Sequence, residues 1–185
     1  GTIAAGSGTV TISDSDDAGI GLGDDTALGM DITGAEIQNI TAGTVEFATA
    51  GGVNVDNITA ANSNNIDTVL IDTTGAVEFK TAASLFNALT VESDQDVDIN
   101  VAITTDTGAL TIDADDDNGG GSGDNRIDMA AGLTLTSATS ITLDATTGDI
   151  VFAGAGTLDA AKGVTINDDL TVNGGTTTID ADNHD

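Results

Sequence analysis

Aspartate is the residue type with the clearest potential for chemistry in this sequence, because it recurs in short clusters between apolar segments. Carboxylate oxygens are ligands that Ca²⁺ prefers, and the ion takes about six to eight oxygens in flexible sites. The clusters therefore predict structural Ca²⁺ sites. The candidate ligands are Asp14, Asp16, Asp17, Asp24, Asp113, Asp115, Asp117, Asp124, Asp180 and Asp182.

The middle cluster has the spacing nearest to that of a known calcium loop. Asp113, Asp115, Asp117 and Asp124 fall at positions 1, 3, 5 and 12 of an EF-hand loop. However, Asn118 replaces the expected glycine, the last ligand is Asp instead of Glu, and no helical pattern flanks the loop. The alternative interpretation is that the acidic loops are solvated and keep the protein soluble. Both interpretations stay open, because crowded carboxylates would also favour a bound divalent ion.

Catalysis finds little support among the other reactive residue types. The chain has no Cys, Trp or Tyr, a single His, and three basic residues against 31 acidic ones. A carbohydrate-active site combines catalytic carboxylates or bases in a cleft with aromatic side chains that stack on sugars, and the Trp and Tyr are missing. We therefore expect that the protein is not an enzyme. We expect His184, Lys80, Arg126 and Lys162 to be surface groups or local partners of nearby Asp residues.

Net charge and hydropathy exclude two further classes of partner. A formal charge of −28 at pH 7 repels phosphates, whereas nucleic-acid binding needs cations and stacking aromatics. No apolar run approaches the roughly 20 residues of a membrane-spanning helix, so we expect no membrane insertion. High charge with few aromatics is typical of disorder. The chain is nevertheless 39% hydrophobic, and the placement of these residues predicts a folded protein.

Apolar residues recur in pairs around one intervening residue, which is the pattern of a strand with one buried face. The intervening residue is commonly Thr, which suits the solvated face of a sheet. Residues 81–89 are the best candidate for a helix, and they predict at most one turn. The apolar pairs are Val10/Ile12, Ile20/Leu22, Met30/Ile32, Val45/Phe47, Val53/Val55, Val69/Ile71, Val77/Phe79, Leu89/Val91, Val97/Ile99, Leu110/Ile112, Ile127/Met129, Leu133/Leu135, Ile141/Leu143, Ile150/Phe152, Val164/Ile166 and Leu170/Val172.

A β-solenoid accounts for these strands better than a β-sandwich does. The strands are short and their apolar residues are small, whereas a sandwich core about 10 Å thick usually needs large aromatics. Strand centres recur roughly every 8 residues, so three faces give about 24 residues per coil. Residues 1–185 then form a single all-β unit, a parallel β-solenoid of about seven or eight coils. No capping element is evident, so we expect uncapped ends.

The ends of the chain resemble its middle when they are read as continuous. Residues 112–115 and residues 179–182 both have the sequence IDAD. The segments that follow, 127–137 and 3–13, are also similar if residue 185 is joined to residue 1. This similarity predicts that the chain is one period of a tandem or end-to-end array.

Several segments resemble the repeats of very large bacterial surface proteins. They are residues 30–41, 58–66, 86–91 and 140–148, in which short apolar strands alternate with Thr, Asn, Asp and Gly. In these segments the chain is similar to giant bacterial β-strand-repeat surface proteins and, more broadly, to filamentous-haemagglutinin-like adhesins. The resemblance implies a secreted, elongated, right-handed parallel β-helix without catalytic residues.

Together these features predict a structural protein that is extracellular or on the cell surface. The expected function is a filament or adhesin stalk built from stacked β-solenoid repeats. Its main partner would be the protein itself, through end-to-end stacking or covalent tandem repeats, with other cells or matrix as further partners. The alternative is a calcium-dependent module that binds glycans or a cell surface, in which Ca²⁺ in the acidic loops holds the ligand.

Overall fold

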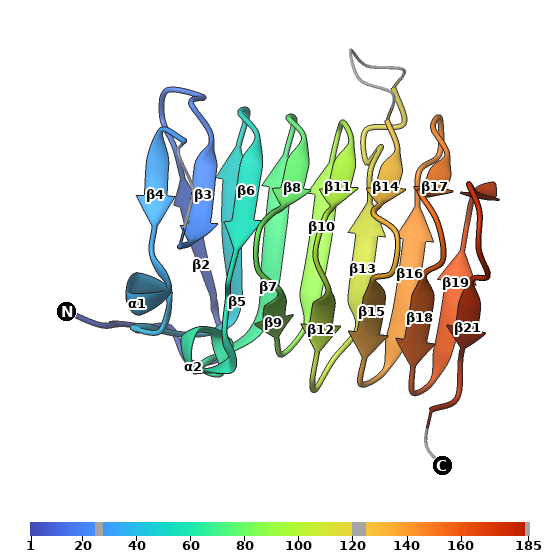
Figure 1. The fold of residues 1–185 in the computed structure, drawn as a ribbon. Coiled ribbons are helices and arrows are strands. Elements are labelled where there is room, and N and C mark those ends of the chain that lie inside the picture. Colours follow the sequence, from blue (N-terminus) through green and yellow to red (C-terminus); the bar gives the residue numbers. More distant parts are fainter. Residues whose placement is uncertain (25–27, 120–124, 184–185) are drawn as a thin grey trace.

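The protein is described by a computed structural model that covers residues 1–24, 28–119 and 125–183. Its strands form three sheets that run side by side along the molecule (Figure 1). The first sheet contains β1 (Ile3–Ala4), β2 (Thr9–Ser13), β5 (Ile40–Thr49), β7 (Ile66–Thr73), β10 (Leu89–Ser93), β13 (Leu110–Asp113), β16 (Ser140–Asp144) and β19 (Gly163–Ile166).

The second sheet begins with a strand that is out of chain order, and the third begins beside two short helices. The second sheet contains β4 (Met30–Ile32), β3 (Ile20–Gly23), β6 (Val53–Asp56), β8 (Val77–Phe79), β11 (Val97–Ile99), β14 (Ile127–Met129), β17 (Ile150–Phe152) and β20 (Leu170–Val172). The third sheet contains β9 (Ser84–Phe86), β12 (Ile103–Thr105), β15 (Thr134–Ser137), β18 (Thr157–Ala160) and β21 (Thr178–Asp180). The helices α1 (Gly34–Ile37) and α2 (Ala60–Ser63) contact each other, and α2 contacts β9, so they extend this third row.

The chain contributes one strand to the first sheet, one to the second and one to the third, or to the helices that extend it, and then repeats this circuit. We call each circuit a coil. For example, β7, β8 and β9 form one coil, and β10, β11 and β12 form the next. Val45, Val69, Leu89, Leu110 and Ile141 are successive register partners in the first sheet, and their numbers differ by 24, 20, 21 and 31. The parallel strands in stacked sheets confirm the predicted all-β class and are consistent with a β-solenoid.

In most strands alternate residues point inward and pack in columns to form one core, whereas β1 and β21 are exposed throughout. In the first sheet Val45, Val69, Leu89 and Leu110 expose at most 2% of their surface. Burial of one such side chain stabilises the fold by about 1.5–3 kcal/mol, so the columns hold successive coils together. The four Phe are also buried, and they are Phe47, Phe79, Phe86 and Phe152.

Buried hydroxyls shape the corner between the first and second sheets. The Oγ atoms of Thr49, Thr73 and Ser93 accept hydrogen bonds from the backbone N–H groups two residues later, at 2.9, 3.0 and 3.2 Å. Ser93 also donates its hydroxyl to the Gly75 carbonyl of the preceding coil at 2.8 Å. A buried polar group left without a partner costs about 1–3 kcal/mol. The hydroxyls therefore fix the backbone where it turns from one sheet to the next.

The N-terminal end departs from regular stacking. β4 follows β3 in the chain, yet it pairs along the edge of β3 that faces away from β6 (Figure 1). α1 comes next and begins with a capping box, in which the Glu36 carboxylate accepts the Thr33 N–H at 2.9 Å and the Thr33 hydroxyl at 2.8 Å. The strand pattern of the sequence predicted neither the edge pairing of β4 nor the helix α1.

The remaining sequence predictions about local structure have mixed outcomes. Residues 81–89 contain β9 and no helical turn, in keeping with the prediction of at most one turn. Ile112 lies in the first sheet and Ile179 in the third, so the two IDAD segments occupy different positions in the coil. The tandem array stays a prediction. Among the described residues, no helix has the length and hydropathy needed to span a membrane.

Candidate functional site

The predicted calcium ligands at the start of the chain lie at separate corners and engage different groups. Asp14 follows β2 and accepts the Gly19 N–H at 2.9 Å, and a hydrogen bond from the Thr49 side chain lowers the pKa of the Asp14 carboxyl. Asp24 follows β3 and accepts the Asn57 amide. These backbone and amide bonds close the turns, and they already satisfy a carboxylate oxygen of each Asp. The exposed residues between them are Asp16 and Asp17.

The middle cluster does not adopt the ligand arrangement of an EF-hand. Asp115 is completely buried, and its two oxygens accept the Asn125 amide at 3.0 Å and the Thr147 N–H at 2.7 Å. Asp113 instead accepts the Asp115 N–H at 3.1 Å, and Asp117 is exposed and accepts the Gly119 N–H at 2.8 Å. The Asp115 side chain therefore serves to hold the loop to the next coil. Asp124 lies outside the described residues.

The third cluster is exposed at the end of the chain, where Asp180 accepts the Asp182 N–H at 3.3 Å. Within residues 1–24, 28–119 and 125–183, no three or more Asp, Glu or His side chains form a group that could hold a metal ion. Among the described members of the predicted sets, no three carboxylates are thus gathered at one point, and the calcium sites stay a prediction. The structure explains Asp14, Asp24, Asp113 and Asp115 as residues that stabilise corners.

A different set of carboxylates does come together, on the outer face of the first sheet. Asp72, Glu92, Asp113 and Asp144 are successive register partners in β7, β10, β13 and β16, and we call them the first acidic ladder. Neighbouring strands lie about 4.8 Å apart, so each charge faces another of the same sign. Partial burial and then nearby carboxylates raise the pKa values of Asp72 and Glu92. Partial burial is also the main reason for the raised pKa of Asp113.

A second acidic ladder lies on the second sheet and is partly neutralised. Its members are Glu78, Asp98 and Asp128, which are register partners in β8, β11 and β14. Burial and then the neighbouring Asp128 raise the pKa of the central Asp98 carboxyl. The ladder has a cation at each end, because Lys80 lies 3.7 Å from Glu78 and Arg126 lies 3.2 Å from Asp128. Arg126 is thus a local partner of an Asp, as predicted, whereas Lys80 pairs with a Glu.

The sequence pattern did not reveal the ladders, because their members are far apart and irregularly spaced along the chain. Each member is the polar residue beside an apolar pair, such as Asp98 between Val97 and Ile99. Aligning the apolar pairs coil by coil would have placed these polar residues in columns. That alignment needs the coil lengths, which vary with the size of each loop.

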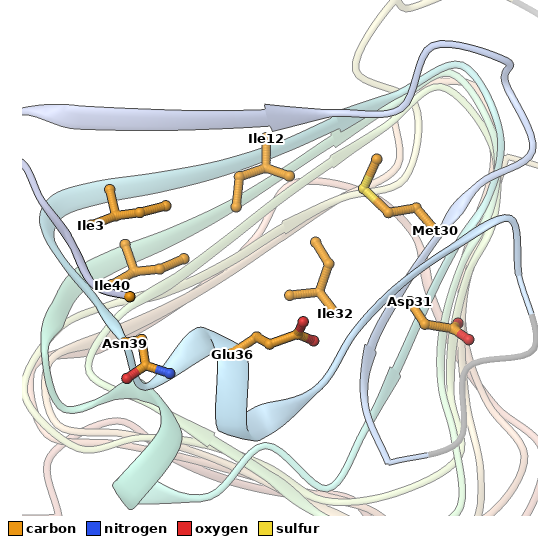
Figure 2. A pocket seen from close by; sticks show the side chains of 9 residues that line it. Ile3, Ile12, Met30, Asp31, Ile32, Glu36, Asn39 and Ile40 are labelled. Carbon is orange, nitrogen blue, oxygen red and sulfur yellow. The ribbon is translucent and has the colours of Figure 1, made fainter.

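The open N-terminal end of the core contains a hollow. A cavity of about 420 Å³ lies between β1 and β2 on one side and β4 and α1 on the other. Figure 2 shows that the side chains of Ile12, Met30 and Ile32 surround it. Asp31 and Glu36 give this apolar hollow an acidic border.

Comparison of the chain with protein-family models, curated proteins and solved structures gives no match. The features that bear on function are therefore the three sheets, the two acidic ladders and the two open ends of the stack.

Proposed function

We propose that the protein is a structural rod, a right-handed parallel β-solenoid that acts as a stalk or filament segment on the cell surface or outside the cell. In this proposal the described elements are grouped into seven coils, from β2, β3 and α1 at one end to β19, β20 and β21 at the other. At about 4.8 Å per coil, the rod extends roughly 34 Å along its axis. Right-handedness is the general rule for crossovers between parallel strands of one sheet.

The observation that carries this proposal is the unbroken register of the columns. Thr11, Glu46, Leu70 and Thr90 follow one another along the first sheet, and Thr111, Thr142 and Thr165 continue the same column. Successive coils are thus joined by parallel strand pairing along the whole length of the first sheet. Such a stack transmits load along its axis and offers proteases few loose segments.

Self-association through the ends is the second part of the proposal. The outer edges of β2, β4, β19, β20 and β21 have no strand partner among the described residues. Unpaired edges with apolar side chains are templates for pairing with another chain. Among the described residues, Ile3 near the N-terminal end and Ile179 in β21 are the exposed large hydrophobic residues, each at 49%.

Electron microscopy and light scattering test the proposal directly. We expect particles whose length is a multiple of about 34 Å, and an average mass that rises with protein and salt concentration. A compact monomer that stays monodisperse at high concentration, with or without Ca²⁺, would rule out the filament.

A calcium-dependent surface module is the second candidate function. The observation that favours it is the first acidic ladder. Asp72, Glu92 and Asp113 do not form a group that could hold an ion in this structure, but divalent cations gathered near the ladder would relieve the repulsion between them. Thermal unfolding in Ca²⁺, in Mg²⁺ and in chelator separates the two candidates, because a structural rod without ion sites responds to both cations alike.

A further inference from the structure

The N-terminal end carries one protruding strand and, beside it, one strand-wide recess. β2 and β3 belong to the same coil, but only β3 is covered on its outer edge, by β4. The inward side chains of the two strands differ in burial for this reason. Ile20 and Leu22 of β3 are 0% and 1% exposed, whereas Val10 and Ile12 of β2 remain partly exposed.

The recess is apolar and has room for a strand. It opens into the cavity of about 420 Å³, and its walls are Ile12 of β2 and Met30 and Ile32 of β4 (Figure 2). The side chains of β4 alternate in the same way as those of β2, with Asp31 on the outer face between its two apolar residues. The protruding strand therefore has the length and the alternation that the recess requires.

We propose that two copies of the chain associate head to head through these N-terminal ends, with β4 of each copy seated in the recess beside β2 of the other. This inference specifies which ends meet, and it rests on the proposed self-association. A two-fold axis perpendicular to the rod places the first sheet of one copy above the second sheet of the other. Each protruding strand then fills the partner's recess, which is the self-complementary arrangement of a two-fold interface.

The proposed contact continues the strand pairing that the chain already makes within itself. The order of strands becomes β6, β3, β4 of one copy, followed by β2 and β5 of the other, so strand pairing continues across the contact. The two-fold rotation reverses the chain direction, so β4 and the second copy's β2 pair antiparallel. Pairing of their central residues sets Asp31 opposite Thr11. Met30 then meets Ile12, and Ile32 meets Val10, all on the inward side.

A head-to-tail contact fits the same end less well. Seating β19 of a second copy on β2 would align Val164 with Val10 and Ile166 with Ile12, as in the columns of the first sheet. However, β20 belongs to the same coil as β19, and it would arrive at the level that β4 already occupies. The β4 strand thus blocks this mode of stacking and favours the head-to-head mode.

Charge sets the conditions under which the pair forms. The chain carries a net charge of −28, and Asp31 and Glu36 border the hollow. The two ends therefore repel each other at low ionic strength. Because the screening length falls to about 4–5 Å near 0.5 M salt, association should strengthen as NaCl is raised.

Site-directed disulfide formation tests the inference, since the natural chain has no cysteine. T11C and D31C are prepared as separate single variants and are oxidised at 0.5 M NaCl, each alone and as a mixture. Opposed residues of an antiparallel pair lie about 4.5–5.5 Å apart between Cα atoms, within the range that a disulfide spans. We expect a covalent dimer in the mixture and little in either variant alone.

Two control variants at the C-terminal end distinguish head-to-head from head-to-tail association. Thr165 lies in β19 and Thr171 in β20, so T165C or T171C would cross-link to T11C or D31C only in a head-to-tail contact. Such cross-links, without a T11C–D31C product, would overturn the head-to-head mode while preserving self-association. A monomeric mass for the natural chain at high concentration and 0.5 M NaCl would overturn both.

A charged side chain introduced into the recess tests the same interface through the strength of dimerisation, without cysteine. Ile12→Asp should weaken dimerisation by more than about tenfold, because the charge would be buried against Met30 of the second copy. Ile179→Asp, at the exposed position in β21, is the matched control and should leave the dimer unchanged. Equal effects of the two variants, or no effect of Ile12→Asp, would contradict the proposed interface.

Discussion

Removing one charge from the first acidic ladder should make the protein more stable. Glu92 stands between Asp72 and Asp113 in the register of the first sheet, so Glu92→Gln abolishes two like-charge contacts while it keeps the shape of the side chain. Two unit charges about 5 Å apart repel by about 0.8 kcal/mol in water and by about 3 kcal/mol at the effective dielectric of a protein surface. Because these side chains are partly solvated, we expect a gain of about 1–2 kcal/mol at pH 7.

The pH dependence follows from the direction of the pKa shift. Burial and neighbouring carboxylates raise the pKa of Glu92, so the folded state disfavours its ionised form. The stability linked to this proton is fully present below the pKa of the unfolded state, about 4.3. That stability is lost as the pH rises through the folded-state pKa. The advantage of Glu92→Gln should therefore be largest at pH 7 and vanish near pH 3.

Urea unfolding of both proteins at several pH values measures this difference. Glu36→Gln is a matched control of opposite sign, because bonds from the Thr33 backbone and hydroxyl lower the pKa of Glu36. Its carboxylate contributes stability above the unfolded pKa and loses it as the pH falls through the folded pKa. The reasoning is refuted if Glu92→Gln is less stable than the natural chain at pH 7, or if its advantage is the same at pH 3.

Three further predictions concern the core, the corners and the ions. Phe79→Ala removes a completely buried ring and should cost about 3–5 kcal/mol, whereas Thr111→Ala on the outer face should change the unfolding free energy by less than about 0.5 kcal/mol. Thr73→Val leaves the Gly75 N–H and the Gly51 carbonyl without their partner and should cost about 1–3 kcal/mol in urea unfolding. At equal ionic strength, Ca²⁺ and Mg²⁺ should raise the melting temperature equally, and a larger effect of Ca²⁺ would support the calcium-dependent module.

The strands could be predicted from the sequence because each one contains its own signal. The pairs Val45/Phe47 and Val69/Ile71 alternate with polar residues, and a one-residue shift would expose every one of them. The same local signal predicted that the chain would need only a narrow core of small apolar residues, and the buried columns agree. The class of the fold is thus a property of short segments.

The path of the chain between strands could not be predicted in the same way. Met30–Ile32 has the alternation of any other strand. Its local sequence contains no signal that it pairs on the outer edge of β3 instead of starting a new coil. The start of α1, in contrast, did have a readable signal, because Thr33 followed three residues later by Glu36 is a capping box. That signal was overlooked amid the strong strand pattern.

The candidate sites were the least predictable feature of the protein, because the role of a carboxylate depends on the direction of its side chain as well as on its spacing in the sequence. Asp113, Asp115 and Asp117 are evenly spaced, but Asp115 turns inward to Asn125 and Thr147 while Asp117 turns outward. The first acidic ladder joins Asp72 to Asp144 across three coils, in which successive members are 20, 21 and 31 residues apart. Only the register between coils brings its members into contact.

Distance measurements along one outer column test the stacked-coil rod most directly. Spin labels at Thr11 and, in turn, at Thr111, Thr142 or Thr165 lie four, five and six strands apart in the first sheet. With spin-diluted samples, pulsed electron paramagnetic resonance should give about 19, 24 and 29 Å, in equal steps of about 4.8 Å. Distances that instead follow the unequal numbers of intervening residues, or that do not increase along the series, would contradict the rod.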